Sequence, residues 1–119
     1  MTLMTNEDFN AIAQQAADMV IGRLIKKGKE YAIGTDRLAN FKVQARMYNT
    51  TPIKALIGNM GKHQAWLENP LDDPNIIISD DVIWEHVGDI ICYYVLLIGL
   101  LKERNNELLD YGDTNEKCE

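Results

Sequence analysis

Two carboxylates in the second half of the chain carry the clearest chemical signal. Glu85 and Asp89 stand four residues apart, so on a helix they share one face. Two like charges at this spacing repel each other by roughly 0.2–0.5 kcal/mol. We therefore expect a cation beside them, either a basic side chain or a bound metal ion.

Each of these alternatives implies different partners for the pair. Glu30 and Asp36 are the other carboxylates near apolar segments, and they could join the pair from separate helices. Such a set suits Mg²⁺, a hard cation that keeps water and phosphate oxygens among its ligands. In the alternative interpretation, the pair forms ion pairs with Arg37 or Lys62. Spacing alone favours neither.

The basic side chains are concentrated in one part of the sequence, although the chain carries a net charge of -6. This concentration predicts a local anion site, whereas the plainer interpretation is a solvated helix face. Arg37 is the strongest candidate, because it stands at a predicted helix start, where free backbone N–H groups help to bind phosphate. Lys62, on a later helix, is a second candidate. Seven of the twelve basic residues belong to the concentration: Arg23, Lys26, Lys27, Lys29, Arg37, Lys42 and Arg46.

A helix over residues 79–104 must position the two carboxylates. Its centre, residues 90–101, is apolar on every side, and other elements normally surround such a helix. Twelve apolar residues are well short of the roughly 20 that cross a bilayer. With Ser79 as its cap, we predict a central helix that is the most buried of the fold.

Two helices are predicted in the first half of the chain. The first covers residues 6–27 and begins with capping-box spacing from Thr5 to Asp8. The second covers residues 35–49, with Thr35 as its cap.

A third helix and a loop complete the prediction. Thr51 and Pro52 are typical of a helix start, and the helix is expected to run to residue 68. Pro70 and Pro74 then predict a loop. The expected fold is all-α, a four-helix bundle around the central helix at about 79–104.

The composition is that of one soluble domain. We expect a single helical domain over residues 1–109 and a polar, mobile tail over residues 110–119. Cys92 falls in the apolar helix and Cys118 in the tail, so we expect no disulfide and a reducing compartment. No signal-peptide pattern is visible, so a cytoplasmic location is predicted. The acidic charge argues against duplex nucleic acid.

A longer pattern resembles a known family. It consists of Lys29-Glu30-Tyr31, then Asp36-Arg37-Leu-Ala-Asn40-Phe41, then Lys62-His63, then Glu85 to Asp89 followed by Ile90-Ile-Cys-Tyr93. In order and spacing, over about residues 20–104, it is similar to small phage and prophage proteins related to MazG, and among them to the nucleotide-modification-associated domain.

The resemblance implies an all-α nucleotide-binding protein with Mg²⁺ as a possible cofactor. Many MazG-like proteins cleave nucleoside triphosphates to monophosphate and pyrophosphate. This chain lacks their Glu-Glu-x-x-Glu motif, and its later pair is Glu-x-x-x-Asp where the family has Glu-x-x-Asp. The implied phosphate or nucleotide ligands are Arg37, Asn40, Lys62, His63 and Tyr93, and the implied metal ligands are Glu30, Glu85 and Asp89. From its position alone, His63 is more typical of packing than of catalysis, and two histidines are too few for a zinc cluster.

Three functions remain open at this stage. The first is a Mg²⁺-dependent nucleotide pyrophosphohydrolase. The second is a phage protein, in the cytoplasm of an infected bacterial host, that sequesters a cyclic nucleotide or ADP-ribose-type immune signal without breaking it. The third is a helical adaptor. Short helices cannot easily surround an all-apolar helix, so we also predict a homodimer or homotetramer, with the ligand site near the interface and no membrane association.

Overall fold

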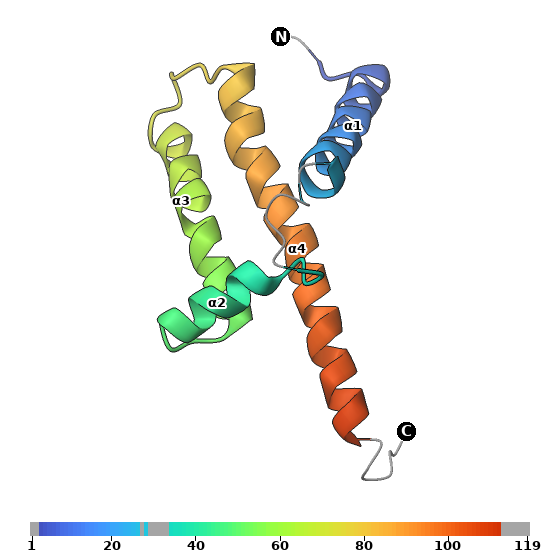
Figure 1. The fold of residues 1–119 in the computed structure, drawn as a ribbon. Coiled ribbons are helices and arrows are strands. Elements are labelled where there is room, and N and C mark those ends of the chain that lie inside the picture. The colour runs from blue at the N-terminus through green and yellow to red at the C-terminus, as the bar shows by residue number, and fades with distance from the viewer. Residues whose placement is uncertain (1–2, 27, 29–33, 113–119) are drawn as a thin grey trace.

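The computed structural model describes residues 3–26, 28 and 34–112. Over these ranges the chain forms four α-helices and no strand (Figure 1). The predicted all-α fold is therefore confirmed.

The helices are arranged around the longest of them, α4 (Asp80–Gly112). α3 (Pro52–Asp72) runs antiparallel beside α4, and the short α2 (Ala39–Met47) crosses near the beginning of α3 (Figure 1). α1 (Asn6–Val20) contacts α4 from another side and continues into a π-helical segment, η1 (Ile21–Lys26). The C-terminal half of α4 projects beyond the other helices.

The helix starts follow local capping chemistry in three places. Thr5 Oγ1 accepts a hydrogen bond from the backbone N–H of Asp8, at 3.0 Å, as its spacing predicts. Thr51 caps α3 in the same way, with Pro52 in first position. Ser79 Oγ accepts from the Val82 N–H at 3.3 Å. These three predicted caps are confirmed.

The predicted start of the second helix is wrong by three residues. α2 begins at Ala39, with Leu38 and not Thr35 in the cap position. Instead, the Asp36 carboxylate accepts one hydrogen bond from the backbone N–H of Leu38, at 3.0 Å, and another from the side chain of Lys42, at 2.7 Å. These two bonds hold the preceding residues in a turn, so helical geometry starts only after it.

The predicted ends of α3 and α4 are too early. α3 includes Pro70 and ends at Asp72, because a proline in the last turn removes only one backbone hydrogen bond, and the Asp73 N–H still bonds to Asn69 O at 3.1 Å. α4 passes Arg104 and ends at Gly112. Glu107, Leu108 and Leu109 are good helix formers, and extending an existing helix adds one hydrogen bond for each residue fixed. The tail predicted from residue 110 therefore begins inside α4, and residues 113–119 lie outside the described part.

The core lies where α2, α3 and the middle of α4 meet. It is formed by Phe41, Leu56, Met60 and Leu100, with Leu56 fully buried. Among the described residues, α3 has more buried residues than any other helix. There are four of them: Ala55, Leu56, Met60 and His63. The prediction that α4 is the most buried helix is therefore wrong. The other helices leave several apolar side chains of α4 exposed, among them Tyr94, Ile98 and Leu101, which explains why its apolar circumference misled the prediction.

The exposed side of α4 gives it the character of a possible membrane helix by length and composition alone. An 18-residue stretch within Asp80–Tyr111 is apolar enough for a membrane-spanning helix, and 11% of that stretch is buried. No other helix in the described part of the chain passes that test.

Two glycines provide a test of the packing between α1 and α4. A Cβ on Gly61 of α3 would meet no atom within 4 Å, so Gly61→Ala should raise the free energy of unfolding by about 1 kcal/mol. A Cβ on Gly88 of α4 would lie 2.6 Å from Met19 Sδ and 2.9 Å from Arg23 Nη1. These atoms are the ends of flexible side chains, which must move to make room, so Gly88→Ala should gain less stability than Gly61→Ala, as measured by urea unfolding. Equal stabilisation by both variants would show that α1 does not pack against Gly88.

Candidate functional site

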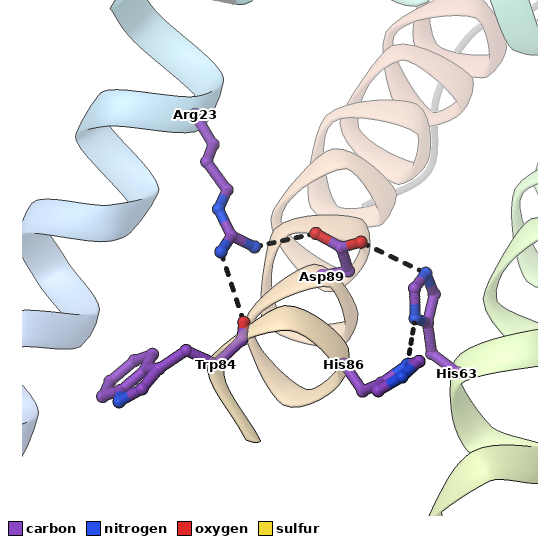
Figure 2. Close-up of polar contacts among 5 residues, drawn as sticks. All are labelled: Arg23, His63, Trp84, His86 and Asp89. Carbon is purple, nitrogen blue, oxygen red and sulfur yellow. Dashed lines mark hydrogen bonds and ion pairs between the residues drawn. The ribbon is translucent and has the colours of Figure 1, made fainter. Parts of the chain in front are cut away.

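The carboxylate of Asp89 is the centre of a polar network that joins three helical segments. Arg23 of η1 donates from Nη1 to Asp89 Oδ1 at 2.7 Å and from Nη2 to the backbone oxygen of Trp84 at 3.2 Å (Figure 2). A basic side chain thus lies beside Asp89, as the repulsion argument requires. The partner is Arg23, and not Arg37 or Lys62. About two fifths of the Asp89 side chain remains exposed, so solvent screens this ion pair.

The other carboxylate oxygen faces a buried histidine of α3. His63 Nε2 lies 3.2 Å from Asp89 Oδ2, and only 4% of the residue is exposed. Its other ring nitrogen, Nδ1, lies 3.0 Å from Nδ1 of His86 (Figure 2). His86 in turn stacks on Trp66, with ring centroids 4.3 Å apart and planes at 15°. One chain of contacts therefore runs from Arg23 to Trp66.

The Asp89 carboxylate determines which ring nitrogens of His63 and His86 carry a proton. Asp89 accepts hydrogen bonds, so His63 Nε2 carries a proton and donates it. Burial lowers the pKa of His63 and outweighs the opposing attraction of Asp89, which keeps the ring neutral at pH 7. A neutral ring has one proton, so His63 Nδ1 is an acceptor and His86 Nδ1 is the donor.

A cavity of about 440 Å³ lies beside the network, between η1, the turn before α2, α2 itself and α4. Its volume is within the usual range for small-molecule sites. Two guanidinium groups, an amide, a phenol and a carboxylate give it polar walls. These belong to Arg23, Arg37, Asn40, Tyr93 and Asp89.

The remaining walls are mainly apolar. Leu24, Phe41 and Leu96 line the cavity, together with Gly28 and Cys92. Burial raises the pKa of the Cys92 thiol, so this group is protonated at neutral pH. The cavity therefore combines positive hydrogen-bond donors with surfaces that an aromatic or apolar group can contact.

Arg37 reaches the cavity from the turn before α2. Its Nη2 donates to the backbone oxygen of Leu24 at 2.6 Å. The guanidinium passes over Gly28, where any Cβ would overlap it. Guanidinium has five N–H donors, and this is the one hydrogen bond from Arg37 recorded among the described residues. The others can serve a ligand.

Lys42 fixes the end of α2 next to the cavity. It bonds Asp36 at 2.7 Å and Glu103 of α4 at 2.9 Å. The hydrogen bond from Lys42 lowers the pKa of Asp36, and Asp36 followed by Glu103 raises the pKa of Lys42. Asp36 is therefore engaged by a lysine rather than grouped with Asp89.

The predicted site residues divide into three groups. Arg37, Asn40, Tyr93 and Asp89 line one cavity, and His63 contacts it through Asp89. Lys62 and Glu85 are exposed and do not line the cavity. Glu30 lies outside the described residues.

Arg23 is the residue that sequence reasoning failed to single out. Arg23 is one of the seven basic residues between positions 23 and 46, and the sequence pattern did not distinguish it from the other six. The available signal is Gly88, immediately before Asp89, because a residue without Cβ lets Arg23 and Met19 come close to α4.

Asp89, one of the predicted metal ligands, is engaged by other side chains in the described part of the chain. Mg²⁺ requires octahedral oxygen coordination, commonly with one or two carboxylates. Both oxygens of Asp89 are engaged, by Arg23 and by His63. Over residues 3–26, 28 and 34–112, no three His, Cys, Asp or Glu side chains are grouped to hold a metal ion. The metal role predicted for Glu30, Glu85 and Asp89 stays a prediction.

The lowered pKa of His63 predicts how stability depends on pH. The unfolded chain binds a proton on this histidine near its ordinary pKa of 6.5, and the folded chain binds it only at lower pH. Stability is therefore complete above pH 6.5 and is lost as the pH falls below that value. We expect the thermal midpoint to drop between pH 7 and pH 5, and His63→Gln to reduce that drop.

Asp36 does not interfere with this measurement. Its pKa is lowered from 3.8, so its contribution is lost only at still lower pH. An unchanged slope between pH 7 and pH 5 in His63→Gln would contradict the buried neutral assignment.

Comparison of the chain with family models, with curated proteins and with solved structures finds no match. The function is therefore inferred from the side chains around the cavity and from the sequence pattern that resembles MazG-like proteins.

Proposed function

We propose that this chain binds a small phosphate-bearing nucleotide in the cavity beside Asp89. The observation that supports the proposal is the gathering of Arg23, Arg37, Asn40 and Tyr93 around one volume of about 440 Å³. Guanidinium groups are suited to phosphate, because their parallel N–H donors match its oxygens. The acidic character of the rest of the chain makes this local arrangement more specific.

The cavity also offers contacts for a base or a sugar. The amide of Asn40 can donate and accept hydrogen bonds at a base edge or a hydroxyl group. Phe41 and Tyr93 supply aromatic surface, and aromatic side chains commonly stack on bases. Burial raises the pKa of Tyr93, with Asp89 adding to the effect, so its phenol keeps its proton as a donor.

Between the two nucleotide functions, the engaged state of Asp89 favours binding without cleavage. In the hydrolase interpretation, a carboxylate would have to leave Arg23 and His63 and join Mg²⁺ with other oxygen ligands. Sequestration needs no such rearrangement, because the arginines contact the ligand directly. We therefore place sequestration of a nucleotide-type signal, as an anti-defence protein, ahead of pyrophosphohydrolysis.

Recovery of the ligand separates these two functions. Nucleotides are first screened by thermal shift, with and without Mg²⁺. The protein is then incubated with the best ligand, denatured, and the released compound identified by chromatography. An intact ligand supports sequestration. Conversion to monophosphate and pyrophosphate that requires Mg²⁺ would establish the hydrolase instead.

Removal of one cavity arginine should weaken binding strongly. Charge-assisted hydrogen bonds are worth roughly 1.5–3 kcal/mol, so Arg37→Ala should raise the dissociation constant by about ten- to a hundredfold. The control is Arg46→Ala, an exposed arginine on α2 that does not line the cavity. Calorimetry on both variants measures the effect. If Arg37→Ala binds like the parent while remaining folded, the ligand site lies elsewhere.

The placement of Arg37 can be tested without changing its charge. A Cβ on Gly28 would overlap the Arg37 guanidinium, so Gly28→Ala should displace it and weaken nucleotide binding about tenfold. Gly22→Ala is the matched control, since a Cβ there meets no atom within 4 Å. Binding that is equally strong in both variants would show that Arg37 does not act from its position over Gly28.

A further inference from the structure

The C-terminal half of α4 carries an apolar stripe that no other described helix covers. Tyr94, Ile98, Leu101 and Leu108 are 48%, 54%, 42% and 54% exposed. They follow one another at intervals of four, three and seven residues. With the exposed Asn105 between the last two, the intervals alternate four and three throughout, which is the heptad spacing of a coiled-coil seam.

This stripe lies on the side of α4 away from the cavity. At about 100° per residue, the cavity-lining residues Asp89, Tyr93 and Leu96 centre roughly 130° from the stripe. α4 is therefore apolar all round because it has two separate apolar faces. One packs inside the chain, and the other is presented to the exterior.

We infer that a second copy of this chain packs against the stripe, α4 against α4, over residues 94–108. A heptad seam is self-complementary, because each side chain at the seam fits between four side chains of an identical helix. Asn105 supports this partner in particular. A single polar residue at a seam position restricts a coiled coil to one register and one oligomeric state.

The size and shape of the chain agree with this partner. Its radius of gyration is 18.4 Å, with extents of 61 × 33 × 31 Å. A compact domain of this length has a radius of gyration of about 13–14 Å. Four large apolar side chains of the stripe, Tyr94, Ile98, Leu101 and Leu108, are between 42% and 54% exposed, and a second copy would remove them from water. The C-terminal part of α4 extends beyond the other helices in Figure 1, so a second helix can approach it.

A bilayer fits the stripe less well than a second copy does. The stretch without charged residues runs only from Ile90 to Leu101, and about 20 residues are needed to cross the hydrocarbon core. At one end Asp89 is paired with Arg23, and at the other Lys102 begins a charged segment. Heptad spacing with one asparagine is a pattern for a protein partner.

The test places a charge in the stripe and compares it with the same change elsewhere. Ile98→Glu would bury two unpaired carboxylates in a symmetric interface, so the dissociation constant of the dimer should rise at least about a hundredfold. Ile57→Glu on α3 is the matched control, since Ile57 is 47% exposed and lies outside the stripe. Sedimentation velocity at micromolar concentration should show a dimer for the parent and for Ile57→Glu, and a monomer for Ile98→Glu.

Leu108→Glu provides a second variant, because it changes an exposed residue near the end of α4 and leaves the core of the monomer intact. It should also give a folded monomer, with helical content checked by circular dichroism. A parent that is monomeric at tens of micromolar, or an Ile98→Glu variant that is folded and dimeric, overturns the inference. Co-sedimentation of the parent with phosphatidylcholine vesicles would assign the stripe to a membrane instead. None of these results depends on the proposed nucleotide site.

Discussion

The central constraint on this molecule is the carboxylate that lies just before a long apolar run. An ionised group that is partly removed from water at such a place is stabilised by hydrogen bonds and by a neighbouring positive charge. For Asp89 these partners are Arg23 from η1 and His63 from α3. Satisfying one side chain therefore determines where two other segments lie against α4. The cavity is the space left between those segments and α2.

The sequence predicted the elements of the fold better than their limits. Capping side chains and periodic apolar residues are local signals, so Thr5, Thr51 and Ser79 marked helix starts correctly. The start of α2 depended on a hydrogen bond between Asp36 and Lys42 that spacing does not reveal. The burial of α4 could not be predicted either, because an apolar circumference does not say whether the cover comes from the same chain.

The site was predictable as a set of residue types but not as a set of pairs. Arg37, Asn40, Tyr93 and Asp89 were proposed from the sequence pattern, and they line one cavity. The choice of Arg23 as the partner of Asp89 required knowledge of the approach of η1 to Gly88. Ion pairing between distant segments follows from packing, and packing has no short-range signature in the sequence.

The network around Asp89 also has an optical consequence. The chain contains two tryptophans, and each touches one end of the network: the backbone oxygen of Trp84 accepts from Arg23, and the indole of Trp66 stacks on His86. The indole of Trp66 lies against a ring that is connected through His63 to Asp89 in the wall of the cavity. The molecule therefore carries an intrinsic fluorophore coupled to its candidate site, without an added label.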